Sequence, residues 1–177
     1  MPLVLSYYDN KILRKRARPI EEISEEIVQL AKEMIAIMDQ NNGIGLAAPQ
    51  VGKSLRLFIA KNYVVEEGGN LVFTTSQVYI NPKLSMPSKE TVIAEEGCLS
   101  IPGIYAEVER PFHICVEAQD LEGKLFIEEA EGLKARIIMH ENDHLNGVLF
   151  IDRIDADARK RLEPLLQEIN RKYTQTT

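Results

Sequence analysis

The pentapeptide His140-Glu141-Asn142-Asp143-His144 is the feature that most constrains this chain. Residues four positions apart lie on one face of an α-helix, so both imidazoles can reach a single metal ion. Glu141 sits about 100° around the helix from His140 and can reach a water molecule at that metal. We therefore predict a helix over residues 133–145 that carries a catalytic metal site. The alternative is two helix histidines exposed by accident.

Two histidines leave such a site incomplete, because a catalytic zinc-type centre takes three protein ligands and keeps one position open. Cys98 is the better third ligand, since Gly97 before it lets the backbone approach closely. Taken alone, Cys98 would be interpreted as a buried free cysteine, which is how we interpret Cys115. His113 lies on an alternating strand and is interpreted as a structural or surface histidine.

A third segment, GIGLAAPQ at residues 43–50, matches the dinucleotide-binding pattern G-x-G-x-x-A. Its context contradicts that interpretation, because the segment follows a predicted helix rather than a strand. Pro49 and Gly52 also disfavour a helix that begins at Ala48. The other interpretation is a loop that offers backbone groups to a peptide. The side-chain amide of Gln50 would then donate a hydrogen bond to an oxyanion.

The remaining periodicity predicts an α+β fold with an antiparallel or mixed sheet. An amphipathic helix is expected between Ser24 and Asn41, and a C-terminal one is expected to begin near Asp155 or Asp157 and to kink or break at Pro164. The expected strands are 55–60, 78–80, 91–94, 114–118 and 125–127. Residues 68–70 are expected to form an exposed loop tip between two strand-like runs, and residues 62–76 are interpreted as a loop that is either a lid or an insertion.

The composition argues against a DNA-binding, a membrane-spanning or a disulfide-rich protein. Apolar residues make up 45% and charged residues 27%, and the net charge is −6, so an overall basic surface for DNA is absent. No apolar run reaches the roughly 18 residues of a membrane span. Two cysteines build no disulfide framework, and the first residues do not resemble a signal peptide. These observations predict one domain over residues 1–177 in the cytoplasm, without a membrane partner.

The motifs GIGLAAPQ, EGCLS and HENDH, in this order and spacing, resemble those of the peptide deformylase family. The resemblance spans at least residues 43–151. It implies small sheets packed around a central HExxH helix, with an N-terminal and a C-terminal helix. It also implies a metallohydrolase that removes the formyl group from N-terminal formyl-methionine of nascent proteins.

The resemblance assigns roles by motif position. Cys98, His140 and His144 would be the metal ligands, and Glu141 would be the general base and then the acid. Gln50 and the backbone N–H of Leu99 would hold the oxyanion. Ile44 and Gly45 would pair with the substrate backbone, and Ile44, Leu133 and Ile137 would line the methionine pocket, with Arg136 near its mouth. The metal would be ferrous iron, with zinc or nickel as alternatives; the ligand set alone suits zinc.

Two features of the chain leave alternatives open. Tyr105 stands near where some relatives place an arginine that touches the distal peptide. A basic C-terminal segment, with Arg159, Lys160, Arg161, Arg171 and Lys172, resembles the helix with which relatives dock on the ribosome, and the alternative is a solvated helix face.

Two other functions were weighed. One is a peptidase or another amidase with the same metal centre. The other is a catalytically silent, metal-binding relative associated with the ribosome. The presence of Glu141, Gln50 and Cys98 argues against a silent relative.

Overall fold

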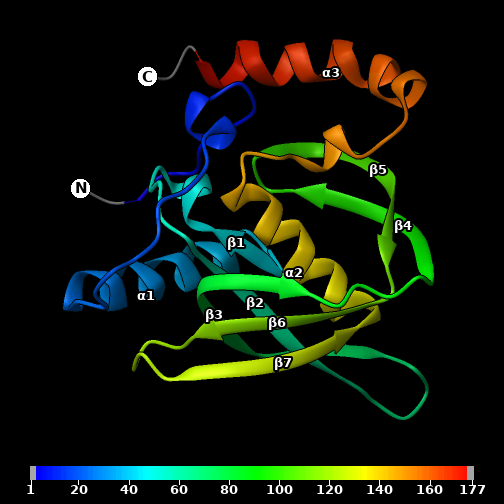
Figure 1. The fold of residues 1–177 in the computed structure, drawn as a ribbon. Coiled ribbons are helices and arrows are strands. Elements are labelled where there is room, and N and C mark those ends of the chain that lie inside the picture. Colours follow the sequence, from blue (N-terminus) through cyan, green and yellow to red (C-terminus); the bar gives the residue numbers. More distant parts are fainter. Residues whose placement is uncertain (1–2, 175–177) are drawn as a thin grey trace.

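A computed structural model describes residues 3–174. Within them lie a five-stranded sheet of order β1-β2-β3-β6-β7, a two-stranded sheet β4-β5 and the helices α1, α2 and α3 (Figure 1). All paired strands are antiparallel, so the α+β prediction is confirmed. The strands are β1 Gly45–Ala47, β2 Leu57–Val65, β3 Leu71–Ser85, β4 Thr91–Cys98, β5 Ile101–Pro111, β6 His113–Gln119 and β7 Leu125–Glu131; the helices are α1 Glu25–Gln40, α2 Gly132–Leu145 and α3 Ala156–Thr174, with 3-10 turns η1 Lys11–Arg14, η2 Ala48–Val51 and η3 Phe150–Asp152.

Helix α2 lies at the centre, between the two sheets (Figure 1), and contacts β1, β2, β5, β6 and β7. One face is apolar: Ala135, Ile138 and Met139 pack into a cluster with the large sheet. The opposite face is also buried but carries Arg136, His140 and Glu141. Because buried polar groups need partners, this face sets up the functional site.

The predicted helices agree with the structure in place and length. The apolar face of the predicted amphipathic helix is the buried face of α1, which contains Leu30, Ala31, Met34 and Met38. A kink or a break is expected at Pro164, but helix α3 runs through this residue without a break. Pro164 lies on the exposed side, so the carbonyl that loses its partner one turn earlier can bond to water. None of the helices of the described chain is both long and apolar enough to span a membrane.

Three backbone predictions were wrong or incomplete. Residues 62–76 are not a loop throughout, because strands β2 and β3 continue into a projecting hairpin. The predicted exposed tip at residues 68–70 is confirmed, and Gly68 and Gly69 there have positive φ. Both faces of this hairpin meet solvent, so its sequence lacks the alternation of a half-buried strand. Strands β1 and β5 were not predicted either. A short 3-10 turn does begin at Ala48, but Gly52 ends it within one turn.

Helix α2 ends at Leu145, as predicted, and Asn146 and Gly147 follow it. Gly147 has φ +74°, and a Cβ there would lie 2.5 Å from the carbonyl oxygen of Arg14. Gly123 has a similar φ of +78°, but a Cβ there would meet only Ile23 at 3.7 Å. A side chain is therefore disfavoured by the positive φ at both glycines. Only at Gly147 would it also clash with another backbone segment.

We expect Gly147→Ala to lower the free energy of unfolding by about 1–3 kcal/mol more than Gly123→Ala. Both variants carry the left-handed penalty of about 1–2 kcal/mol, and only Gly147→Ala adds the clash. Urea unfolding of the two variants beside the unchanged protein measures the difference. Equal losses would show that the contact with Arg14 relaxes at no cost.

Candidate metal centre

Three side chains from two motifs meet at one point. The Sγ of Cys98, at the end of β4, and one ring nitrogen each of His140 and His144, on α2, all lie within 4.8 Å of one another. The Sγ of Cys98 is 3.3 Å from Nε2 of His144. The predicted trio is therefore brought together, by a helix face and by the turn between β4 and β5.

This trio fits a metal ion. With metal–sulfur bonds near 2.3 Å and metal–nitrogen bonds near 2.0 Å, tetrahedral ligands lie roughly 3.5 Å apart. The 3.3 Å between Cys98 and His144 is close to that separation. Burial lowers the pKa of His144, so its imidazole is neutral, as that of a ligand must be. A thiolate and two imidazoles are donors that suit zinc, iron or nickel.

The carboxylate of Glu96 orients the first histidine. Its Oε2 lies 2.9 Å from Nδ1 of His140, which leaves Nε2 to face Cys98. The same carboxylate accepts two hydrogen bonds from Arg110, at 2.8 and 2.9 Å, and one from Arg136 at 2.8 Å. Burial alone would raise the pKa of Glu96, but the hydrogen bonds from Arg110 and His140 hold it well below its usual range. Glu96 is therefore an anion that fixes a ligand.

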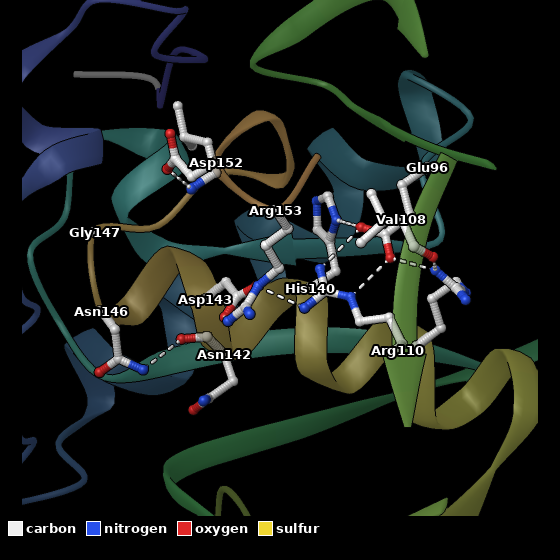
Figure 2. Close-up of polar contacts among 12 residues, drawn as sticks. Glu96, Val108, Arg110, His140, Asn142, Asp143, Asn146, Gly147, Asp152 and Arg153 are labelled. Carbon is white, nitrogen blue, oxygen red and sulfur yellow. Dashed lines mark hydrogen bonds and ion pairs between the residues drawn. The ribbon is translucent and has the colours of Figure 1, made fainter. Parts of the chain in front are cut away.

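The network continues to the second half of α2 (Figure 2). Arg110 also donates to Oδ2 of Asp143 at 2.7 Å, and Arg153 donates to both oxygens of the same carboxylate. Asp143 lies one position before His144. Arg110, on β5, thus joins the strand that carries Cys98 to the helix that carries both histidines.

The carboxylate of Glu141 is buried in the same cavity. Its Oε2 has no hydrogen-bond partner among the described residues. A Cβ on Gly45 would lie 2.4 Å from its Oε1, so the carboxylate occupies the space that a side chain at Gly45 would fill. Burial raises the pKa of Glu141 to about 7; a divalent cation at the trio would lower it. The group can therefore accept and release a proton near neutral pH.

Gln50 is held with its amide nitrogen toward the trio. The backbone N–H of Ala47 donates to Oε1 of Gln50 at 2.8 Å, which fixes which end of the amide points away. Its Nε2 then donates to Sγ of Cys98 at 3.3 Å and to Oγ of Ser100 at 3.2 Å. A donor aimed at the trio is what an oxyanion site needs.

A cavity of about 630 Å³ opens beside these groups, within the size range of sites for small ligands. Leu133, Ile137 and Glu141 lie at four-residue spacing on one face of α2, and all three line it. Ile44, Gly45 and Leu99 line the cavity from the other elements. Arg136 also lines it, but its guanidinium turns to β4 and β5, donating to the carbonyls of Val92 at 2.6 Å and Val108 at 2.8 Å.

The ten residues to which the resemblance assigned a catalytic, substrate-binding or metal-binding role lie around this one cavity or in its metal trio. His113 and Cys115 lie on β6 and take no part in the trio, as interpreted from sequence. Sequence reasoning missed the roles of Arg110 and Asp143, and it noted Glu96 only as a neighbour of Cys98. A charged residue inside a motif next to a ligand is the one signal that pointed to Glu96 and Asp143; Arg110 had none.

Comparisons with known proteins agree with this geometry. A family model described as polypeptide deformylase matches residues 2–160. The chain is 43% identical over 162 residues to peptide deformylase of Thermotoga neapolitana, covering 92% of this chain and 93% of the relative. It is 38% identical over 176 residues to the chloroplastic peptide deformylase 1B of Oryza sativa, covering 99% of this chain but 64% of the relative. A plant peptide deformylase crystal structure matches with a TM-score of 0.89 and 37% identity, covering 100% of this chain and 94% of that one.

We expect Arg110→Met to lower the free energy of unfolding by about 3–5 kcal/mol, because it leaves the buried carboxylates of Glu96 and Asp143 short of a partner. The matched control is Arg14→Met. Arg14 pairs with Asp152 at the surface, with 41% of its side chain exposed against 3% for Arg110, so its loss should cost about 1 kcal/mol or less. Urea unfolding compares the two, and similar losses would contradict the assigned role of Arg110.

Proposed function

This chain belongs to the peptide deformylase family and removes the N-terminal formyl group from nascent peptides, and we propose that Glu141 moves the proton in that reaction. The observation that carries the proposal is the meeting of Cys98, His140 and His144 at one point with the buried carboxylate of Glu141 in the same cavity. Cys98, His140 and His144 would hold the metal. When bound, the metal lowers the pKa of water and polarises the formyl oxygen.

Glu141 first takes a proton from the attacking water. As the carbon–nitrogen bond of the formamide breaks, it gives that proton to the leaving amine, so formate and a free N-terminal methionine result. The burial of the Glu141 carboxylate, whose Oε2 has no hydrogen-bond partner among the described residues, supports both steps, because one group has to accept and then donate within a single turnover. Gly45 supports them too, because the absence of a Cβ there leaves room for the carboxylate.

Gln50 and Leu99 would stabilise the oxyanion. The Nε2 of Gln50 is held toward Cys98 by the hydrogen bond from Ala47 to its Oε1, so it requires little reorientation to donate. Leu99 follows Cys98 in the turn between β4 and β5, so its backbone N–H belongs to the same short segment as a metal ligand. Removal of one such donor costs about 10²–10³-fold in rate in well-studied hydrolases.

The substrate backbone would pair with the free edge of β1. Lys61 N–H already donates to the carbonyl of Ile44 at 2.9 Å, and alternate residues of a strand turn their backbone groups to opposite edges. Gly45 therefore presents its backbone groups to the free edge, where an extended peptide can add as a strand. We assign the backbone pairing to Gly45, and the wall of the methionine pocket to the side chains of Ile44, Leu133 and Ile137.

We propose ferrous iron as the physiological metal, as the family resemblance implies, with zinc or nickel as substitutes. We further propose that residues 1–177 act as one catalytic domain, which the contacts of α2 with strands of both sheets support. A reducing cytoplasm suits a site that needs Cys98 as a thiolate. A ribosome contact would use α3, whose exposed basic residues include Lys160, Arg161 and Arg171; a solvated helix face is the alternative.

We expect Glu141→Gln to lower kcat for a formyl-Met-Ala-Ser peptide by about 10²–10⁴-fold, because the isosteric amide cannot accept the proton. Formate release by protein purified without oxygen is the measurement, and metal analysis shows whether the variant still binds its metal. The control is Glu129→Gln, an exposed glutamate on β7 that should leave the rate unchanged. Full activity of the metal-loaded Glu141→Gln protein would remove Glu141 from the mechanism. A metal-loaded wild-type protein that releases no formate would favour a silent relative.

The metal assignment makes a separate prediction. Protein purified without oxygen should contain iron and should lose its activity in air, since ferrous iron is oxidised there. Chelation followed by anaerobic ferrous iron should restore the rate. Stable full activity of an aerobically purified zinc form would contradict the assignment while leaving the reaction itself in place.

A further inference from the structure

The cavity extends beyond the metal trio to an aromatic wall that the three motifs do not contribute. Tyr173, near the end of α3, and Tyr7, in the N-terminal segment, both line it. Their rings are stacked, with centroids 3.7 Å apart and an interplanar angle of 18°. The C-terminal end of α3 lies beside the N-terminal segment in Figure 1. The two ends of the described chain thus meet at the cavity.

This wall is held in place from both sides. On the N-terminal side, the N–H of Ser6 donates to the carbonyl of Gln50 at 2.7 Å, and the N–H of Tyr8 donates to the carbonyl of Ser100 at 2.8 Å. On the other side, Leu166 and Ile169 of α3 are buried in a cluster with β5. Both tyrosine rings are nevertheless only half-buried and line the cavity, so part of the stack remains available to a ligand. Nζ of Lys172 lies 5.3 Å from the centroid of the Tyr173 ring.

We propose that the stacked rings of Tyr7 and Tyr173 form a subsite for an apolar side chain downstream of the formyl-methionine. The inference rests on the proposed function. The formyl carbon carries only a hydrogen on its far side, so the part of the cavity beyond the methionine pocket can be filled only by later residues of the peptide. Leu5 and Pro102 also line the cavity, and their apolar surfaces suit such a side chain.

Charge supports the same class of ligand. Among the described residues that line the cavity, Arg136 is the only arginine or lysine, and Glu96 already neutralises it. Glu95 lines the cavity and is exposed. An acidic side chain would therefore meet an acidic neighbour, and the cation beside the stack, Lys172, already interacts with the Tyr173 ring. Apolar or aromatic side chains can instead pack on the tyrosine faces.

A second role of the same stack has to be separated from this one. Tyr7 follows Ser6, which bonds to the backbone of Gln50, so the stack could act only as a strap that keeps Gln50 in position. A strap would change kcat for every substrate, short or long. A subsite for a downstream side chain would change KM for bulky apolar substrates and leave kcat in place.

The test compares formyl-Met-Leu-Leu with formyl-Met-Ser-Ser on the anaerobically purified holoenzyme. We expect Tyr173→Ala to raise KM for the leucine peptide about tenfold. KM for the serine peptide should change less than about twofold, and kcat should hold for both peptides. Tyr173→Leu keeps an apolar side chain against the cluster and removes the ring, so it tests the subsite if Tyr173→Ala fails to fold. The matched control is Leu165→Ala, an exposed apolar residue of α3 that does not line the cavity.

Each outcome either supports or overturns the proposed subsite. A selective rise in KM in either tyrosine variant, absent from Leu165→Ala, supports the subsite. An equal loss of kcat with both peptides assigns the stack to positioning of Gln50 and overturns the proposal. Unchanged kinetics with both peptides also overturn it. If the unsubstituted holoenzyme releases no formate from either peptide, the proposed function itself has failed, which is distinct from failure of the subsite.

Discussion

The geometry of the rest of the site depends on the hydrogen bonds that the buried carboxylate of Glu96 accepts. It accepts hydrogen bonds from Arg110, Arg136 and His140, so one anion joins β4, β5 and α2. Burial of an unpaired carboxylate is costly, and the arginines are equally costly to bury alone. Each charge is therefore tolerated only when the others are in place. This mutual dependence makes the ligand geometry a property of the assembled fold.

The two sheets contact opposite faces of α2 and contribute different interactions. The large sheet supplies apolar packing for one face of α2, through residues such as Phe58, Tyr79 and Val116. The small sheet β4-β5 supplies Cys98, and Glu96 and Arg110 tie it to the polar face of α2. Arg136 bonds to carbonyls of both small strands and so limits how far that sheet can move from the helix. The distance between the thiolate and the two imidazoles follows from these ties.

The residues that carry chemistry were predictable from sequence because each has a local signature. The spacing of His140 and His144 has meaning only on a helix, and Gly97 before Cys98 marks a close backbone approach. The buried network was not predictable, because Arg110 lies in a strand that the sequence pattern did not reveal. Burial alternates along β5, but hydrophobicity does not follow it, because Tyr105 is exposed and the charged Arg110 is buried. Pairing partners far apart in sequence leave no such local signature.

The residues that carry out the reaction and the residues proposed to select the peptide come from different parts of the chain. Glu141, Gln50 and the metal trio come from three short motifs, and the close approach of Glu141 to Gly45 brings the third of these motifs against the first. A Cβ at Gly45 would meet Glu141, and a Cβ at Gly97 would lie 2.5 Å from the ring of Tyr105. The walls further along the cavity come from Tyr7 and Tyr173, which no motif contains and which the fold brings together from the two ends of the described chain. Changes in α3 can therefore alter which peptides bind while the atoms that cleave the formamide stay where they are.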